Sequence, residues 1–421
     1  MEFGLTINGT PQYPFQRLDS GYTAPTVSLD AIRKREHKAI REATELAARS
    51  DEMGYDYIFT SEQHFGLWGG NTPHPIQAQT AMVGATETVR LVQLANILPW
   101  HNPVRAAEQA AYLDVLSNGR AEVGIGKGFG DRETAVFGQH WGADNSSQNK
   151  EHVFREAFEV LTEAWTTEGT SVRGEFHSLP SRYTNYQDAI ELGYLTSSTT
   201  EADPRTLYSK SREGVVSNSA PVMPKPEQEP HPQLWRPITN KDAATWAAAR
   251  GVNGCFICSN FAQAKALVDV YHETAKQTDW PDHRPEYHGA ALDRGWDTES
   301  RRGIIPRITV FNTEVADADT IDRWKEGYRF TLSLQQAGST PHPGKPIQID
   351  VEAELTKNDV PIVGDTETII DELARLTSTC GYENLNLNLH IENFGLSHEE
   401  ELTQITSLAS HVLPEVAETG V

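Results

Sequence analysis

Eight short apolar segments alternate along the chain with stretches of helical periodicity, and this alternation constrains the fold more than any other feature. Each segment has the length and composition of a buried strand, and most of the intervening stretches repeat apolar residues at helical spacing. The predicted strands cover residues 3–8, 57–60, 89–98, 120–126, 234–239, 252–258, 307–311 and 385–389. Strands that alternate with helices predict a parallel sheet and the α/β class.

Eight strand–helix repeats are typical of a closed TIM (β/α)8 barrel. We therefore interpret residues 1–421 as a single barrel domain, because such barrels run from about 200 to more than 400 residues when they carry insertions. An open, doubly wound sheet is the alternative, since strand order cannot be read from one sequence.

Three weakly patterned segments interrupt the alternation. Residues 178–230 are polar and contain several prolines, which predicts an insertion on the barrel and no separate core. A second irregular insertion covers about 280–306, and a Gly- and Pro-rich break covers about 338–360. We expect these segments at the carboxyl-terminal face of the barrel, where the loops of TIM-barrel enzymes build the active site.

The composition excludes several classes of protein. Fifty-nine acidic residues against 36 Lys and Arg give a formal net charge of -23, which repels nucleic acid and anionic membranes. Three cysteines cannot form a disulfide scaffold, and no long apolar run predicts a membrane span. The histidines lack metal-binding spacing, so no metal is expected. With no leader sequence recognised at the amino terminus, we expect a cytoplasmic protein.

Three hydrogen-bonding side chains follow the second predicted strand, namely Glu62, Gln63 and His64. Because TIM barrels carry their catalytic groups at strand ends, these residues are candidates for the wall of a site and for its chemistry. A structural hydrogen-bond network in the loop is the alternative.

The third predicted strand offers Ala95 and Asn96. The small Ala95 would let a flat ring approach the backbone, and Asn96 provides both a donor and an acceptor. Asn96 could equally satisfy a neighbouring polar group inside the barrel.

A glycine-rich stretch follows the fourth predicted strand, and it contains Lys127 and Gly128. Its glycines free the backbone to approach a ligand, and Lys127 could hold a phosphate as a point charge. The stretch fits neither the dinucleotide fingerprint nor the P-loop. A tight strand exit with a solvated lysine is the alternative.

Thr239 and Asn240 precede a helix predicted at 243–250. The exposed N–H groups and the positive end of that helix would attract an anion, although Asn240 could serve only as an N-cap. On the eighth strand, polar residues alternate with leucines. We interpret Asn384 and Asn386 as an internal network, and Asn388 and His390, nearest the strand's end, as lining the ligand cavity.

Five stretches of this chain together resemble the bacterial luciferase-like, flavin-dependent monooxygenases. The similarity is continuous over residues 1–165, resumes over 231–251 and is ordered from 361 to 414. The stretches are TSEQHF at 60–65, ILPWHNP at 97–103, LDVLSNGR at 113–120, GIGKGF at 124–129 and HPQLWRP at 231–237.

The resemblance implies a TIM barrel, usually a homodimer, that binds reduced FMN made by a separate flavin reductase. With O2 it would oxygenate a small organic substrate whose identity the sequence does not specify. It also implies a mobile lid loop at about 338–360.

The resemblance further assigns roles to individual residues. Ala95 would lie against the flavin after an unusual peptide bond, and Glu62 would belong to the flavin wall. Lys127 stands where the family often has a phosphate-binding arginine. Thr239 and Asn240 fall on the phosphate loop.

The chain departs from bacterial luciferase at one position. Luciferase has Glu-His-His here and uses the middle histidine as a base, whereas this chain has Gln63. Glutamine accepts no proton at neutral pH, so His64 or a substrate group would have to serve. A deazaflavin-dependent oxidoreductase and a non-catalytic flavin-binding or partner subunit are the alternatives. The Glu-Gln-His sequence and the stretch at 97–103 favour the FMN branch.

Overall fold

The chain folds into two compact units. In unit 1 lie Met1–Asn96, Arg120–Ile125 and Gln233–Val421, and in unit 2 lie Ile97–Gly119 and Gly126–Pro232. The computed structural model describes the chain except for residues 67–71, 129–130, 139–146, 168, 180–207, 212–213, 218–221, 279–302, 340–348, 382–384 and 420–421.

Within the described part of unit 1, eight parallel strands form a closed barrel. They are β1 (Phe3–Thr6), β4 (Tyr57–Thr60), β5 (Arg90–Gln93), β7 (Ala121–Gly126), β12 (Leu234–Ile238), β13 (Asn253–Ile257), β14 (Ile304–Asn312) and β16 (Leu387–His390). The ladder runs from β12 through β13, β14, β16, β1, β4 and β5 to β7, and β12 then pairs with β7. Each strand matches a predicted one, so the TIM barrel is confirmed and the open sheet is wrong.

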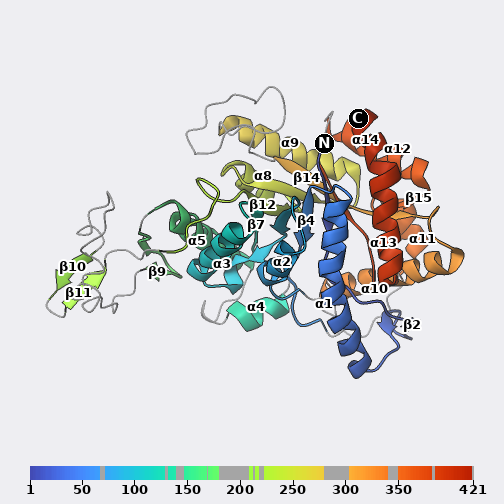
Figure 1. Ribbon diagram of the computed structural model, residues 1–421, viewed down its shortest axis with the longest axis horizontal. Coiled ribbons are helices and arrows are strands. Elements are labelled where there is room, and N and C mark those ends of the chain that lie inside the picture. Colours follow the sequence, from blue (N-terminus) through green and yellow to red (C-terminus); the bar gives the residue numbers. More distant parts are fainter. Residues whose placement is uncertain are drawn as a thin grey trace. The chain divides into compact units, whose positions relative to one another are not determined.

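Helices flank the barrel strands of unit 1, and α1 and α13 lie side by side (Figure 1). No described helix is long and apolar enough to cross a bilayer. The helices are α1 (Leu29–Glu52), α2 (Pro75–Val83), α8 (Lys241–Ala248), α9 (Phe261–Gln277), α10 (Ala318–Ser339), α11 (Val351–Lys357), α12 (Thr366–Cys380), α13 (His398–Ser407) and α14 (Leu413–Thr419), with a π-helical turn, η4 (Leu408–Val412), before α14.

Side-chain caps fix where several of these helices begin. Ser28 accepts a hydrogen bond from the Ala31 N–H, which fixes the start of α1 at Leu29. Asp350 likewise caps α11, which occupies part of the predicted break at 338–360. Residues 340–348 of that break, and most of the insertions at 178–230 and 280–306, lie outside the described residues.

Short strands complete unit 1. An antiparallel ribbon joins β2 (Phe15–Arg17) to β3 (Thr23–Pro25), and β15 (Ile362–Gly364) extends the barrel ladder beside β14. The first three residues of β14 belong to the end of the predicted insertion at 280–306.

Unit 2 is built on α3 (Pro103–Leu116) and α5 (Ser147–Thr166), which pack against each other. Asn102 caps α3 as predicted, and Trp165 donates to the Ala107 carbonyl at 2.9 Å. The remaining elements are β6 (Asn96–Ile97), which ends unit 1 and begins unit 2, the 3-10 turn η1 (Leu98–Trp100), α4 (Asp131–Phe137) and the ribbons β8 (Val172–Arg173) with β9 (Ser178–Leu179) and β10 (Tyr208–Ser211) with β11 (Gly214–Ser217).

Bulky side chains fill the interior of the barrel. Trp235 is fully buried, and its indole N–H donates to Glu122 at 2.6 Å. Around it pack Tyr57, Phe59, Val92, Leu94, Cys255 and Ile305. The barrel is therefore solid below its mouth, as expected for this fold.

Gly124 allows β7 to approach β5 closely. A Cβ at this position would lie 1.7 Å from the Gln93 carbonyl oxygen. We expect Gly124→Ala to lower the free energy of unfolding by about 3 kcal/mol or more, because the backbone would have to move. Urea unfolding of the purified protein measures this change. The matched control is Gly84→Ala, where an added Cβ would meet no described atom within 4 Å; equal stability of the two variants would contradict the expectation.

Candidate functional site

A cavity of about 510 Å³ opens at the carboxyl-terminal ends of the barrel strands in unit 1. This volume lies within the usual range for small-molecule sites, about 300 to 1,000 Å³. Strand ends and α10 both contribute to its wall. The polar lining includes Asn8, Gln63, Thr239, Cys258, Arg307, Thr309, Tyr328, Thr331, His390 and Glu392.

Glu62 and His64 form a buried pair after β4. Glu62 Oε1 lies 2.9 Å from His64 Nε2, and the two side chains are 0% and 9% exposed. Gln63, between them, lines the cavity. The three consecutive residues thus have different roles. Glu62 and His64 hold each other in place, and Gln63 borders the space that a ligand would occupy.

Ala95 and Asn96 are buried where β5 leads into the next loop. The Leu94–Ala95 peptide bond is cis, which is the unusual bond that the resemblance implied. The Asn96 amide nitrogen donates to Gln93 Oε1 at 3.1 Å and to the Gly124 carbonyl at 3.2 Å. Asn96 therefore has the internal structural role that the sequence left open.

Thr239 lines the cavity, and Asn240 caps α8. The Asn240 side chain accepts from the Ala243 N–H at 3.0 Å, so one of the orphan donors at this helix end is already satisfied. Asp242 in the first turn adds a negative charge there, which weakens the attraction of the helix end for an anion.

Lys127 and Gly128 lie in unit 2. Lys127 Nζ is 3.2 Å from Glu151 Oε2, and its side chain is 36% exposed, so the lysine is paired and not merely solvated. Gly128 adopts a φ of +83°, and a Cβ there would lie 2.8 Å from the Trp100 ring. Glycine is therefore required at 128 by the turn itself.

The polar residues of the eighth strand follow the prediction at two positions and differ from it at one. Asn386 bonds to Glu2, and His390 lines the cavity, which confirms both interpretations. Asn388 does not line the cavity: it is fully buried and accepts from the Thr6 hydroxyl at 3.1 Å, so that prediction was wrong. It lies one layer deeper in the barrel than His390. Asn384 lies outside the described residues.

Arg307 and Glu392 are the two charged cavity residues that sequence reasoning missed. The sequence around each of them carries a pattern that could have identified it. Arg307 is the charged residue in the otherwise mostly apolar β14, and Glu392 continues the alternation of polar residues through Asn388 and His390. On β14, Arg307 alternates with the core residue Ile305 and so points towards the barrel axis. Glu392 lies two residues beyond the end of β16.

Burial sets the protonation of these cavity residues. Burial raises the pKa of Glu392 to about 7, although Thr331 and Arg307 favour its charged form. Burial and the nearby Arg307 charge hold the pKa of His390 well below its usual value, so the imidazole is neutral. Burial also raises the pKa of Tyr328 to about 12. Below about pH 7, Arg307 is the dominant charge of this group.

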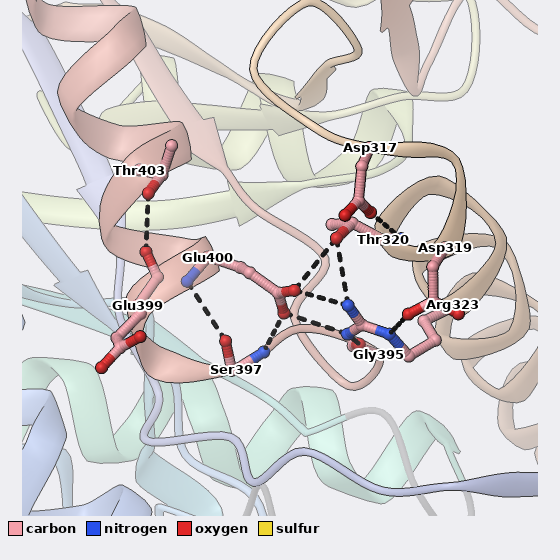
Figure 2. A network of polar contacts seen from close by, with 9 residues as sticks. All are labelled: Asp317, Asp319, Thr320, Arg323, Gly395, Ser397, Glu399, Glu400 and Thr403. Carbon is pink, nitrogen blue, oxygen red and sulfur yellow. Dashed lines mark hydrogen bonds and ion pairs between the residues drawn. The ribbon is translucent and has the colours of Figure 1, made fainter.

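The segment after β16, which carries Glu392, is anchored to α10 (Figure 2). Arg323 donates to the Gly395 carbonyl and to Glu400, each at 3.0 Å. Glu400 also closes a capping box with Ser397 at the start of α13. The Arg323 hydrogen bond lowers the pKa of Glu400 to about 2. This network fixes the backbone on one side of the cavity.

The cysteines of the CxxC sequence are free thiols, with Cys255 buried in the barrel and Cys258 on the cavity wall. Burial raises the pKa of each to about 12, so both are protonated. Throughout the described residues, no group of three or more His, Cys, Asp and Glu side chains is arranged to hold a metal ion.

A profile of luciferase-like monooxygenases matches residues 18–381, which is most of the chain. The chain belongs to the luciferase-like monooxygenase family. The superfamily includes FMN-dependent monooxygenases and oxidoreductases that use the deazaflavin coenzyme F420. The family and the barrel identify the chain as an oxidoreductase of this superfamily.

Relatives from both branches are similar to this chain. An uncharacterised protein, y4wF, of Sinorhizobium fredii is 28% identical, covering 78% of this chain and 79% of the relative. An F420-dependent glucose-6-phosphate dehydrogenase of Amycolatopsis mediterranei is 30% identical over 33% of this chain and 42% of its own. An alkanal monooxygenase beta chain of Photorhabdus luminescens is 26% identical over 34% and 43%.

Solved structures share the fold over nearly the whole chain. Monooxygenase RslO1 of Streptomyces bottropensis superposes with a TM-score of 0.69 at 19% identity, covering 98% of this chain and 99% of its own. The oxygenating constituent of 3,6-diketocamphane monooxygenase from Pseudomonas putida, solved with FMN, gives 0.63 at 19% identity, covering 98% of each chain. At these identities the likeness establishes the fold.

Glu392 makes the stability of this barrel depend on pH. Its pKa is about 7 in the folded protein against an ordinary 4.5, so between these values the folded state holds a proton that the unfolded state releases. The free energy of unfolding therefore falls as pH rises through this window. We expect Glu392→Gln to remove roughly 3 kcal/mol of that decline.

Urea unfolding at a series of pH values from about 4.5 to 8 measures the decline. The matched control is Glu108→Gln on the exposed surface of α3, which should keep the wild-type slope. A wild-type slope in Glu392→Gln would show that this carboxyl does not titrate in the window.

Proposed function

We propose that this protein is a two-component monooxygenase that uses reduced FMN and O2 to oxygenate a small organic substrate. The observation that carries the proposal is the buried Glu62–His64 hydrogen bond beside Gln63, at the mouth of a luciferase-like barrel. In this proposal a separate flavin reductase supplies the reduced FMN, and the enzyme works as a homodimer.

The described cavity suits a flavin and a small substrate. It has a volume of about 510 Å³, with apolar walls from Ile257, Pro361 and Phe394 for a flat ring. Gln63 and Thr239 supply hydrogen-bonding groups for the polar edge of the ring. Reduced FMN, when bound, supplies the electrons that activate oxygen.

The protein's own contribution is to hold His64 and to restrict water. Glu62 Oε1 lies 2.9 Å from His64 Nε2, and this contact fixes the orientation of the ring. His64 is therefore the proposed base in place of Gln63, whose amide cannot take a proton.

A deazaflavin-dependent oxidoreductase is the second candidate. It is favoured by the 30% identity to an F420-dependent dehydrogenase, although the alignment covers 33% of this chain. A partner subunit without catalytic activity is a further alternative, because an alkanal monooxygenase beta chain is also among the relatives.

An anaerobic titration with reduced FMN separates these candidates. We expect saturable binding, followed on exposure to air by flavin reoxidation that is slower than that of free reduced FMN, since a protected site restricts water and side reactions. Protein fluorescence and flavin absorbance measure the two steps. The deazaflavin candidate predicts preferential binding of reduced F420, and the partner subunit predicts unaltered reoxidation; either result would refute the proposal.

Within the same titration, Lys127→Ala should weaken reduced-FMN binding by about 1 to 3 kcal/mol, the usual cost of losing a charged hydrogen-bond partner. The matched control is Lys265→Ala, which removes an exposed lysine on α9. Unchanged affinity in Lys127→Ala would reject its assignment to the phosphate, and Lys127 would then serve only its ion pair with Glu151.

His64→Ala should lower turnover much more than it lowers flavin affinity, because the proposed base acts on the reacting groups and not on FMN binding. Gln63→Ala provides the neighbouring comparison and should change substrate or flavin affinity more than proton transfer. Stopped-flow turnover and flavin titration give the two quantities. Equal activity of wild type and His64→Ala would leave the Glu62–His64 pair with a structural role.

A further inference from the structure

The Arg307 side chain is a partly buried cation to which no described residue makes a hydrogen bond or an ion pair. It lies on the inward face of β14 and lines the cavity. No ion pair or hydrogen bond to its side chain is present among the described residues, and its Nε is buried with no partner there. Removing a charge from water costs free energy unless another group compensates it. An anionic ligand could supply that compensation for Arg307.

Below about pH 7, where Glu392 is protonated, the groups that face Arg307 do not neutralise it. Glu392 interacts with it electrostatically, but burial raises the pKa of that carboxyl to about 7. His390, whose Nδ1 is also buried and unpartnered among the described residues, is neutral. Tyr328 from α10 is a neutral phenol, and Cys255 a neutral thiol. The cavity therefore holds a net positive charge inside a protein of formal net charge -23.

The position of Arg307 on β14 separates it from one predicted flavin residue of the barrel, Ala95. It is paired in register with Asn388 of β16 on one side and with Ile257 of β13 on the other. Ala95, the candidate ring-contacting residue, follows β5, which β16, β1 and β4 separate from β14 in the ladder. A guanidinium presents a planar fork of donors that matches a carboxylate in two hydrogen bonds.

We propose that Arg307 is the substrate-binding residue of the cavity and that the substrate is a small organic acid whose carboxylate pairs with this guanidinium. The claim that the bound acid is the substrate rests on the proposed function. The claim that the cavity binds an anion rests on the geometry of the cavity alone. The carboxylate end lies against β14 and β16, at the side of the cavity that Arg307 lines.

Binding of the acid is coupled to the proton on Glu392. The charged and titratable groups around Glu392 are Arg307, His390 and Tyr328 in the cavity, and Glu401 of α13 behind it. When Glu392 loses its proton, its charge repels the ligand and compensates Arg307 in its place. The affinity for a carboxylate therefore falls as pH rises through about 7.

Isothermal titration of the full-length protein with benzoate, and with benzamide as its neutral counterpart, tests this inference. At about pH 6, where benzoate is an anion, we expect benzoate to bind and benzamide to bind far more weakly. Arg307→Met should weaken benzoate binding about 10- to 100-fold, the usual cost of losing a charged hydrogen-bond partner. It should leave the FMN affinity unchanged.

Three further variants control for misfolding, for a general charge effect and for the titrating carboxyl. Arg307→Lys keeps the charge but not the planar fork, so it should retain part of the benzoate affinity. Arg33→Met removes an exposed arginine of α1 and should bind benzoate as wild type does. Glu392→Gln should bind benzoate equally well at about pH 6 and 8, because the titrating group is gone.

The outcomes are distinct. Equal binding of benzoate and benzamide, no benzoate binding by wild type, or unchanged benzoate affinity in Arg307→Met would each overturn the inference. A loss of FMN affinity in Arg307→Met as large as the loss for benzoate would assign the guanidinium to the flavin and overturn it as well. If benzoate binds through Arg307 but wild type fails to bind FMN, the anion site stands and the proposed function fails.

Discussion

Closure of the parallel ladder between β7 and β12 is the constraint on which the rest of the molecule depends. When all strands are parallel and the sheet is closed, their carboxyl-terminal ends meet around one mouth. Residues far apart in the sequence, such as Gln63 after β4 and His390 on β16, then line one cavity. The bulky interior packed around Trp235 gives that cavity a floor.

The low dielectric of this mouth controls its chemistry. Removal from water raises the pKa of Glu392 and lowers the pKa of His390, and both changes leave Arg307 as the uncompensated charge. The segment that carries Glu392 is held by Arg323 and by close backbone contact at Gly395 (Figure 2). These contacts hold the backbone that carries Glu392 in a fixed position, as a binding site requires.

Periodicity was sufficient for the strands of the fold, because each of the eight is apolar, short and bounded by turn residues. Helices α2 and α11 escaped it. Each buries few apolar side chains, Pro75 and Met82 in α2 and Val351 in α11, so neither shows a clear apolar stripe. Of the candidate site residues, Gln63 and Thr239 line the described cavity, whereas Asn96 and Asn240 have internal and capping roles. Residue type and strand position alone do not distinguish these cases.

The sequence by itself determined the barrel, the strand ends that carry polar groups and the family, because local periodicity and short motifs are properties of neighbouring residues. Only the tertiary structure decided that Glu62 holds His64, that Asn388 lies too deep to reach the cavity, and that Arg307 has no partner among the described residues. Those outcomes depend on strand register and on which side chains from distant segments meet. Register is set by long-range pairing and packing, which no single stretch of sequence contains.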